Sequence, residues 1–156
     1  LHQDLSWIGF DPITSEPSVV PQWVETAFGS MPVSAAVAGC ETDYLILCWP
    51  DSADLRDLRA PGPELGEHTR RAIIATCADT QSPARDIRYR YFAPQHGIAE
   101  DIATGSAMRV LASFWQAHAG YDALRAWQCS ADGGHLFSRI EDDVTWVGGR
   151  VTADSV

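Results

Sequence analysis

The segment 105–119 restricts the possible folds more than any other, because its helical pattern is apolar almost all round. Most of its positions are Met, Val, Leu, Ala, Phe or Trp. The polar exceptions fall on one narrow stripe at helical spacing: Arg109, Ser113 and Gln116. A helix with so little polar surface is buried. The rest of the chain must therefore surround this helix, and Phe114 and Trp115 are expected to be among its most enclosed residues.

The segments available to surround the helix alternate, or run apolar, in the manner of β-strands. Strands are expected at residues 5–10, 33–38, 44–49, 71–77, 87–92, 126–130, 135–140 and 144–147. Tight turns are expected at residues 39–43, 132–134 and 141–143. The predicted fold class is therefore α+β, with a mixed β-sheet or barrel-like layer wrapped around a central buried helix.

The first third of the chain has weaker patterns. Residues 11–17 are expected to form a loop, since they are rich in Pro, Ser and Thr. Pro21 and Gly29 delimit a short helix, because Pro favours the first turn of a helix and Gly the position after its end. A second brief helix is expected farther on, with Asp51 or Ser52 as its cap.

The strand at 87–92 alternates between an aromatic face and a largely basic face. Arg88 and Arg90 lie on the basic face, which we expect to be solvated. The alternative is that these two arginines steer a carboxylate substrate.

Composition excludes several classes of function. The formal net charge of −10 argues against nucleic acid and anionic membranes as partners, because both require a basic surface. No apolar run is long enough to span a bilayer, and the first residues do not resemble a signal peptide. All eleven basic residues are arginine. The absence of lysine excludes Schiff-base chemistry, pyridoxal-phosphate anchoring and the phosphate-loop lysine.

Cysteine and histidine show no metal-binding spacing, so no metal site is predicted. The four cysteines are far apart in sequence and lie in apolar segments: Cys40, Cys48, Cys77 and Cys129. Buried reduced thiols in a cytoplasmic protein are expected, in preference to a disulfide framework. His96 lies in the loop that leads into the motif described next, and we expect it to be a surface loop residue.

The residues that lead into the buried helix are arranged as an anion site. An aromatic strand and a Pro/Gly loop are followed by Glu100-Asp101 and then by Thr104-Gly-Ser-Ala107. The first amides of a helix have no intrahelical partner, and the helix dipole favours negative charge at this end. Small side chains let a ligand approach the backbone closely. Thr104 is the expected N-cap, with the amides of Gly105, Ser106 and Ala107 directed at the anion.

This region resembles the PhzF-like family of phenazine-biosynthesis isomerases, which has the diaminopimelate-epimerase-like fold. The second domain of that family carries a pattern close to R-x-F-A-P-x-x-G-x-x-E-D-P-x-T-G-S-A-H before a helix rich in Leu, Ala and Trp. The chain has Arg90-Tyr-Phe92-Ala-Pro94, Gly97, Glu100-Asp101 and Thr104-Gly-Ser-Ala107 at those spacings. Gln128, Gly133-Gly134 and Val147-Gly-Gly149 are similar to the closing hairpins of the family.

The resemblance covers roughly residues 20–150, whereas family members are about twice as long. It implies that residues 21–156 are the second domain, and that residues 1–20 are an extended lead-in or the end of a missing first domain. In the family the first domain supplies a catalytic glutamate and a Gly/His-rich anion loop, and neither has a counterpart here. Two positions also depart from the pattern: Ile102 replaces proline, and Met108 replaces histidine.

The resemblance implies that Asp101 is a proton-transfer or hydrogen-bonding group at the floor of a cleft. Thr104, Gly105, Ser106 and Ala107 would bind the substrate carboxylate, with no metal or organic cofactor. Taken alone, an Asp at this position is more often a loop or capping residue, and small residues at a helix start often serve close packing. In epimerase relatives with a cysteine pair, one cysteine falls where Thr104 stands, so a two-thiol mechanism is not expected.

Two hypotheses about function follow. The first is one half of a PhzF-like isomerase or epimerase that moves a proton on a small carboxylate metabolite. Its missing half would come from a second copy, giving a homodimer, or from a partner chain. The second is a binding or structural module that kept the fold without the catalysis, because a shared fold does not transfer chemistry.

Overall fold

The computed structural model describes residues 5–97, 105–129 and 133–150. The strands are β1 (Leu5–Phe10), β2 (Ser15–Ser18), β3 (Ser34–Ala38), β4 (Tyr44–Cys48), β5 (Ala72–Ala78), β6 (Ile87–Phe92), β7 (Ala123–Gln128), β8 (Gly134–Glu141) and β9 (Val144–Arg150). The helices are α1 (Trp23–Phe28) and α2 (Gly105–Ala119), with short 3-10 helices η1 (Leu55–Asp57), η2 (Pro63–Glu67) and η3 (Pro94–His96).

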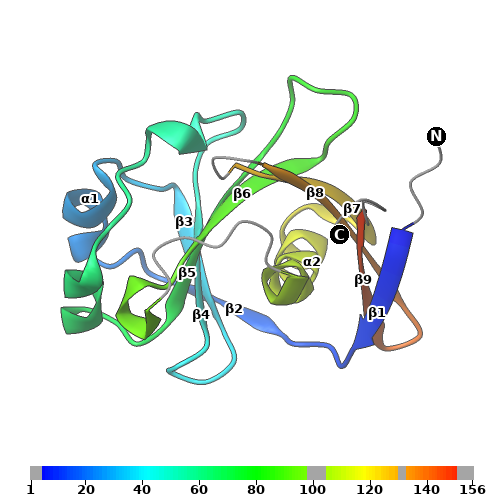
Figure 1. The fold of residues 1–156 in the computed structure, drawn as a ribbon, viewed down its shortest axis with the longest axis horizontal. Helices are drawn as coiled ribbons and strands as arrows, with labels where there is room; N and C mark the ends of the chain where they lie inside the picture. Colours follow the sequence, from blue (N-terminus) through cyan, green and yellow to red (C-terminus); the bar gives the residue numbers. More distant parts are fainter. Residues whose placement is uncertain (1–4, 98–104, 130–132, 151–156) are drawn as a thin grey trace, which may run out of the picture.

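All nine strands belong to one mixed sheet, in the order β1-β9-β8-β7-β6-β5-β4-β3-β2. The β4/β5 and β6/β7 pairs are parallel, and the other pairs are antiparallel. The sheet curls around α2, which is seen nearly end-on at its centre in Figure 1. This confirms the predicted α+β class and the wrapped arrangement.

The two edge strands of the sheet, β1 and β2, are neighbours in sequence. Residues 11–14 connect them and pass from one edge of the curled sheet to the other (Figure 1). β1 and β2 therefore define the two edges, and the seven strands that follow them in sequence fill the sheet between them.

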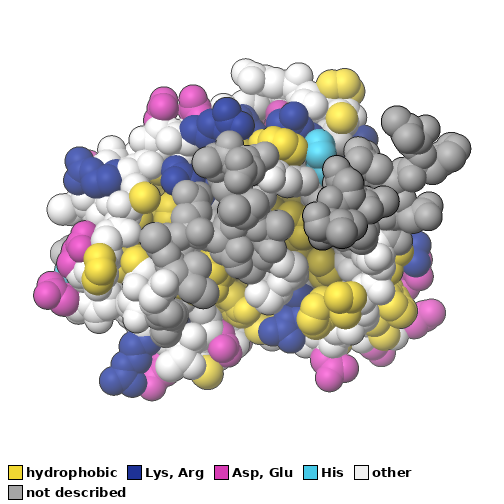
Figure 2. All heavy atoms as spheres, viewed as in Figure 1, with side chains coloured by type: hydrophobic (Ala, Val, Ile, Leu, Met, Phe, Trp, Pro, Cys, Tyr) yellow, Lys and Arg dark blue, Asp and Glu magenta, His cyan; other side chains and the backbone are white. Residues whose placement is uncertain are grey.

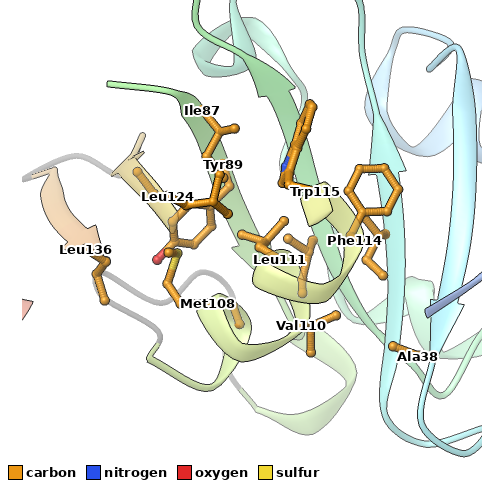
Figure 3. Packing of buried hydrophobic residues seen from close by; sticks show 14 of the residues in the cluster. Ala38, Ile87, Tyr89, Met108, Val110, Leu111, Phe114, Trp115, Leu124 and Leu136 are labelled. Carbon is orange, nitrogen blue, oxygen red and sulfur yellow. The ribbon is translucent and has the colours of Figure 1, made fainter. Parts of the chain in front are cut away.

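The concave side of the sheet and α2 form the main core, as Figure 3 shows for part of this cluster. The helix contributes seven buried residues: Ala107, Met108, Val110, Leu111, Ala112, Phe114 and Trp115. Trp115 is 2% exposed, which confirms the prediction for this residue. Phe114 is also buried, but at 6% it is the least enclosed of the seven.

A second core lies on the convex side of β3–β6, where α1 and the two 3-10 helices η1 and η2 cover the sheet. Phe28 of α1 packs edge-on against Trp49 and Phe92, with ring centroids 6.0 and 5.5 Å apart. Because both faces of these strands are covered, β4 and β5 are apolar at nearly every position.

The prediction of a solvated basic face on β6 is wrong, because this second layer covers that face. Arg90 is 7% exposed, and its Nη1 donates to the carbonyls of Leu55 and Leu58 at 2.8 and 3.1 Å. Its guanidinium also lies 4.6 Å from the ring centroid of Phe92. Arg88 is largely buried and lies 3.5 Å from Asp79. Arg90 thus attaches η1 to the sheet.

Two smaller predictions also need correction. Residues 15–17, expected in a loop, belong to β2, which pairs with β3 from Ser15↔Ala38 to Ser18↔Ala35. Pro17 is accommodated because an edge strand has one side without ladder partners. The first 3-10 helix is capped by Asp54, whose carboxylate accepts from the amide of Arg56 at 3.1 Å, and not by Asp51 or Ser52.

The predicted helix at 21–29 is confirmed: α1 ends at Gly29, whose φ is +77°. The turn at 39–43 is closed by Asp43, which accepts from the amide of Cys40 at 2.8 Å. This hydrogen bond lowers the pKa of the Asp43 carboxyl. The β8–β9 turn contains two residues with positive φ, Asp142 and Asp143, as the tightest hairpin turns require.

Candidate anion site at the start of the central helix

Three of the predicted anion-site residues lie in the first turn of α2. Gly105 is partly exposed, Ser106 is exposed and Ala107 is fully buried. Among the residues that the structure describes, the one atom that a Cβ at Gly105 would meet is Cγ1 of Val147, at 4.0 Å, an ordinary van der Waals contact. The side chains of the first turn itself are small, so they leave its amides accessible to a ligand.

Among the described residues, charge near this turn favours an anion. The first turn of α2 carries no acidic residue, so no carboxylate of the turn itself competes for its amides. Arg109 follows one turn later, and its guanidinium lies 5.8 Å from the ring centroid of Phe10. Figure 2 keeps the orientation in which α2 is central: hydrophobic side chains are visible around the middle of this face, and most Asp and Glu side chains lie at its margins.

A buried polar pair supports α2 from the sheet. The hydroxyl of Tyr89 on β6 lies 3.2 Å from Oε1 of Gln128 on β7, and both residues are fully buried. Tyr89 belongs to the same core as Met108 of the first helical turn, and the two side chains lie close together in Figure 3. A buried amide is costly unless it is hydrogen-bonded, so this pair fixes the position of β7 against β6. The sequence signal is a glutamine at an inward-facing position of an alternating strand.

The remaining predicted site residues, Asp101 and Thr104, lie outside the described residues, as does Glu100. Gly105, Ser106 and Ala107 form the first turn of α2, and their anion-binding role stays a prediction, as does the acid/base role of Asp101. Met108, where the family pattern has histidine, is fully buried in the core.

In the part of the chain that the structure describes, no group of three His, Cys, Asp or Glu residues is placed to hold a metal ion. All four cysteines are free. Cys48, Cys77 and Cys129 are buried as predicted, whereas Cys40 is exposed in the β3–β4 turn, contrary to the prediction. Burial raises the pKa of the Cys48 thiol to about 11 and that of the Cys77 thiol to about 12.

Comparison with known proteins decides the family. A family model described as phenazine biosynthesis-like protein (PhzC-PhzF) matches residues 15–141, from β2 to the end of β8. The chain belongs to this family. The resemblance inferred from the motif around the start of α2 is thereby confirmed.

Individual members of the PhzC-PhzF family show the same relationship. A human phenazine biosynthesis-like domain-containing protein is 48% identical over 63 residues, which are 40% of this chain and 22% of the human protein. A protein of Pseudomonas aeruginosa named an uncharacterized isomerase is 34% identical over 127 residues, which are 81% of this chain and 46% of the relative. The chain thus spans less than half the length of these curated relatives.

Solved PhzF structures share the fold. A phenazine biosynthesis protein of the PhzF family from Enterococcus faecalis superposes with a TM-score of 0.81 at 23% identity. The match covers 96% of this chain and 55% of the other. The fold is therefore the diaminopimelate-epimerase-like fold predicted from the sequence. Within the described residues, no helix has the length and hydrophobicity needed to cross a membrane.

Proposed function

We propose that this chain is half of a PhzF-like isomerase that moves a proton on a small carboxylate metabolite. The observation that carries the proposal is the first turn of α2, which has three small residues and no acidic side chain, in a member of the PhzC-PhzF family. Relatives of similar sequence from two bacteria are named isomerases.

The chemistry assigns one role to each group. The amides of Gly105, Ser106 and Ala107 hold the substrate carboxylate at the positive end of α2, with Thr104 as the N-cap. Asp101 removes a proton from a carbon near that carboxylate, and the negative charge left on the substrate is stabilised by the helix dipole. The proton then returns at another carbon or on the other face. The reaction needs no oxidant, cofactor or metal.

The proposed site is completed by a second chain. The curated relatives are more than twice as long as the region they share with this chain. We propose that a second copy, or a partner chain that supplies the first domain, covers the α2 terminus and contributes the second acid/base group. The four free thiols support a reducing compartment such as the cytoplasm.

Proton exchange tests this function directly. The purified chain is incubated in D₂O with a panel of small carboxylates that carry a substituent at C2 or C3. The loss of their C–H signals is followed by NMR. Exchange that Asp101→Asn abolishes supports the proposal. Asp51→Asn is the matched control, because Asp51 is exposed and lies in the turn after β4. Exchange that persists in Asp101→Asn removes Asp101 from the mechanism.

A binding module without catalysis is the second candidate. Met108 favours it, because this position is buried and provides no ionisable group where the family pattern has histidine. The test is made at concentrations where the chain is bound to a second copy or a partner chain. If carboxylates then bind at residues 105–107 without any C–H exchange, the binding module is favoured over the enzyme.

A further inference from the structure

A cavity of about 340 Å³ opens to solvent between α1 and η2, on the convex side of the sheet. Figure 1 shows α1 across β3–β5 from α2, so this cavity is separate from the anion site proposed at the start of α2. Its volume lies within the range of about 300–1,000 Å³ that small-molecule sites usually have. The cavity is therefore large enough for a small metabolite.

The floor of the cavity is apolar. It is lined by Ala27 of α1, by Pro61 and by Leu65 of η2, and Leu65 is 1% exposed. One wall is the indole of Trp23, which stacks on the imidazole of His68 with ring centroids 5.3 Å apart and 11° between the ring planes. Trp23 and Ala27 also pack against the second core, which keeps them in place. Such a surface gains free energy when an apolar ligand group covers it.

Two side chains of opposite charge line the same cavity, and each is held in place by the backbone. Nη1 of Arg59 donates to the carbonyl of Thr26 at 3.1 Å, and Oε1 of Glu64 accepts from the amide of Gly62 at 3.0 Å. Hydrogen bonds from its own amide and from that of Gly62 lower the pKa of the Glu64 carboxyl, so it is ionised at neutral pH. Within the described residues, Arg59 and Glu64 form no ion pair with each other. The cavity thus presents a cation and an anion at separate points.

This pair of charges favours one class of ligand. A ligand with a carboxylate alone would match Arg59, but Glu64 and the net charge of −10 would repel it. A ligand with an ammonium group alone would match Glu64 and be repelled by Arg59. A zwitterion matches both side chains and has no net charge. The apolar floor adds a requirement for an apolar substituent on that zwitterion.

We propose that this cavity binds a free α-amino acid with an apolar side chain. The guanidinium of Arg59 binds the carboxylate of the ligand, and the carboxylate of Glu64 binds its ammonium group. The ligand side chain covers the apolar floor. Both charged side chains are exposed, so each ion pair is weak in water and the dissociation constant is expected to be on the order of millimolar. The proposal does not depend on the isomerase reaction.

Titration of the whole chain with L-leucine, followed by heteronuclear NMR, tests the proposal. Saturable shifts are expected at the amides of Ala27 and Leu65 and at the indole N–H of Trp23, which line the cavity. Three analogues dissect the ligand: isocaproate lacks the ammonium group, isoamylamine lacks the carboxylate, and glycine lacks the apolar side chain. Each should bind roughly fivefold or more weakly than L-leucine, because each leaves one part of the cavity unmatched.

Two variants assign the charges. Arg59→Gln should weaken L-leucine binding roughly fivefold and should not weaken isoamylamine binding, because isoamylamine has no carboxylate. Glu64→Gln should weaken L-leucine binding by a similar factor and should not weaken isocaproate binding. Arg139→Gln and Glu41→Gln are the matched controls, since both side chains are exposed and neither lines the cavity. Both controls should bind L-leucine like the wild type.

The proposal is overturned if L-leucine causes no saturable shift at the cavity, or if any of the analogues binds as tightly as L-leucine. An unchanged affinity for L-leucine in either Arg59→Gln or Glu64→Gln would also overturn it. The same spectra separate this site from the proposed function. Shifts restricted to the amides of residues 105–107 would support the anion site and overturn the amino acid site, whereas shifts at the cavity alone would support the amino acid site and count against the anion site.

Discussion

Trp115 and Thr76 are joined by a buried hydrogen bond that attaches the central helix to the middle of the sheet. The indole Nε1 of Trp115 donates to Oγ1 of Thr76 at 3.2 Å, and the Thr76 hydroxyl donates in turn to the carbonyl of Arg88 at 2.8 Å. One hydroxyl group thus connects α2, β5 and β6 and satisfies both a donor and an acceptor in the core.

Thr76→Val should lower the free energy of unfolding by about 1–3 kcal/mol, because it leaves the indole N–H and the Arg88 carbonyl without this partner. Thr76→Ser is the control: it keeps the hydroxyl and loses one methyl group, about 0.8 kcal/mol. Urea unfolding followed by tryptophan fluorescence measures both. If the valine variant proved as stable as the serine variant, the hydrogen bond would have no net value.

Trp115→Ala should cost about 3–5 kcal/mol, the usual range for removing a large side chain from a core. Phe114→Ala should fall at or below the low end of that range. Phe114 lines a cavity open to solvent together with Ser15, Pro17 and His118, so water can occupy the vacated space. Thermal and urea unfolding of both variants provide the comparison, and an equal or larger loss for Phe114→Ala would contradict this account of the cavity.

Arg90→Lys should destabilise the protein by about 2 kcal/mol, since an ammonium group cannot reproduce the planar stacking on Phe92 while donating to two carbonyls. Arg70→Lys is the control because the Arg70 side chain is 75% exposed, and its effect should stay within about 0.5 kcal/mol. Hydrogen exchange should also report faster opening of η1 in the Arg90 variant alone.

Native thiol labelling at pH 8 should modify Cys40 rapidly and the other three cysteines only after unfolding. Cys40 is exposed, whereas burial raises the pKa of Cys48 to about 11 and of Cys77 to about 12, so few thiolates form there. Cys40→Ser should remove the fast phase. These folded-state pKa values lie above the ordinary thiol value near 8.5. The contribution of the buried neutral thiols to the free energy of unfolding is therefore complete below pH 8.5, and it is lost as the pH rises toward about 12.

Small carboxylates, sulfate or phosphate should shift the backbone amide resonances of Gly105, Ser106 and Ala107 at millimolar concentration. The physical reason is the set of unpaired N–H groups at the start of α2. Ser106→Asp should weaken the response, because its carboxylate would occupy the same positive end. Chloride at matched ionic strength is the control, and a titration without residue-specific shifts at these positions would exclude the site.

Patterns in the sequence predicted the core of this fold well. The all-round apolar pattern of 105–119 predicted a helix enclosed by the rest of the chain. Most strands were predicted from alternation or from apolar runs. β2 could not be predicted, because Ser15-Glu-Pro-Ser18 has little intrinsic strand preference and is extended only through its pairing with β3. The parallel β4/β5 and β6/β7 pairs depend on distant contacts that local patterns do not encode.

The burial of Arg90 also depends on distant contacts that local sequence patterns do not encode. Alternation along β6 distinguishes its two faces, but whether a face meets water depends on the layer formed by α1, η1 and η2 more than twenty residues earlier. At the site, helix-start chemistry assigns Gly105, Ser106 and Ala107 to an anion site, and that assignment stays a prediction. The Tyr89–Gln128 hydrogen bond was not predicted, because the inward-facing glutamine of β7 can be noticed in the sequence but its partner is known only once β6 and β7 are aligned.

The pairing of β1 with β9 has a consequence for synthesis on the ribosome. β1 leaves the ribosome before its ladder partner, Val144–Arg150, which is synthesised only after the seven other strands. Contacts this distant in sequence form slowly. While residues 11–143 are being synthesised, the neutral strand with Ile8 near its centre has no native neighbour, so it is exposed to chaperones and to mispairing during that interval.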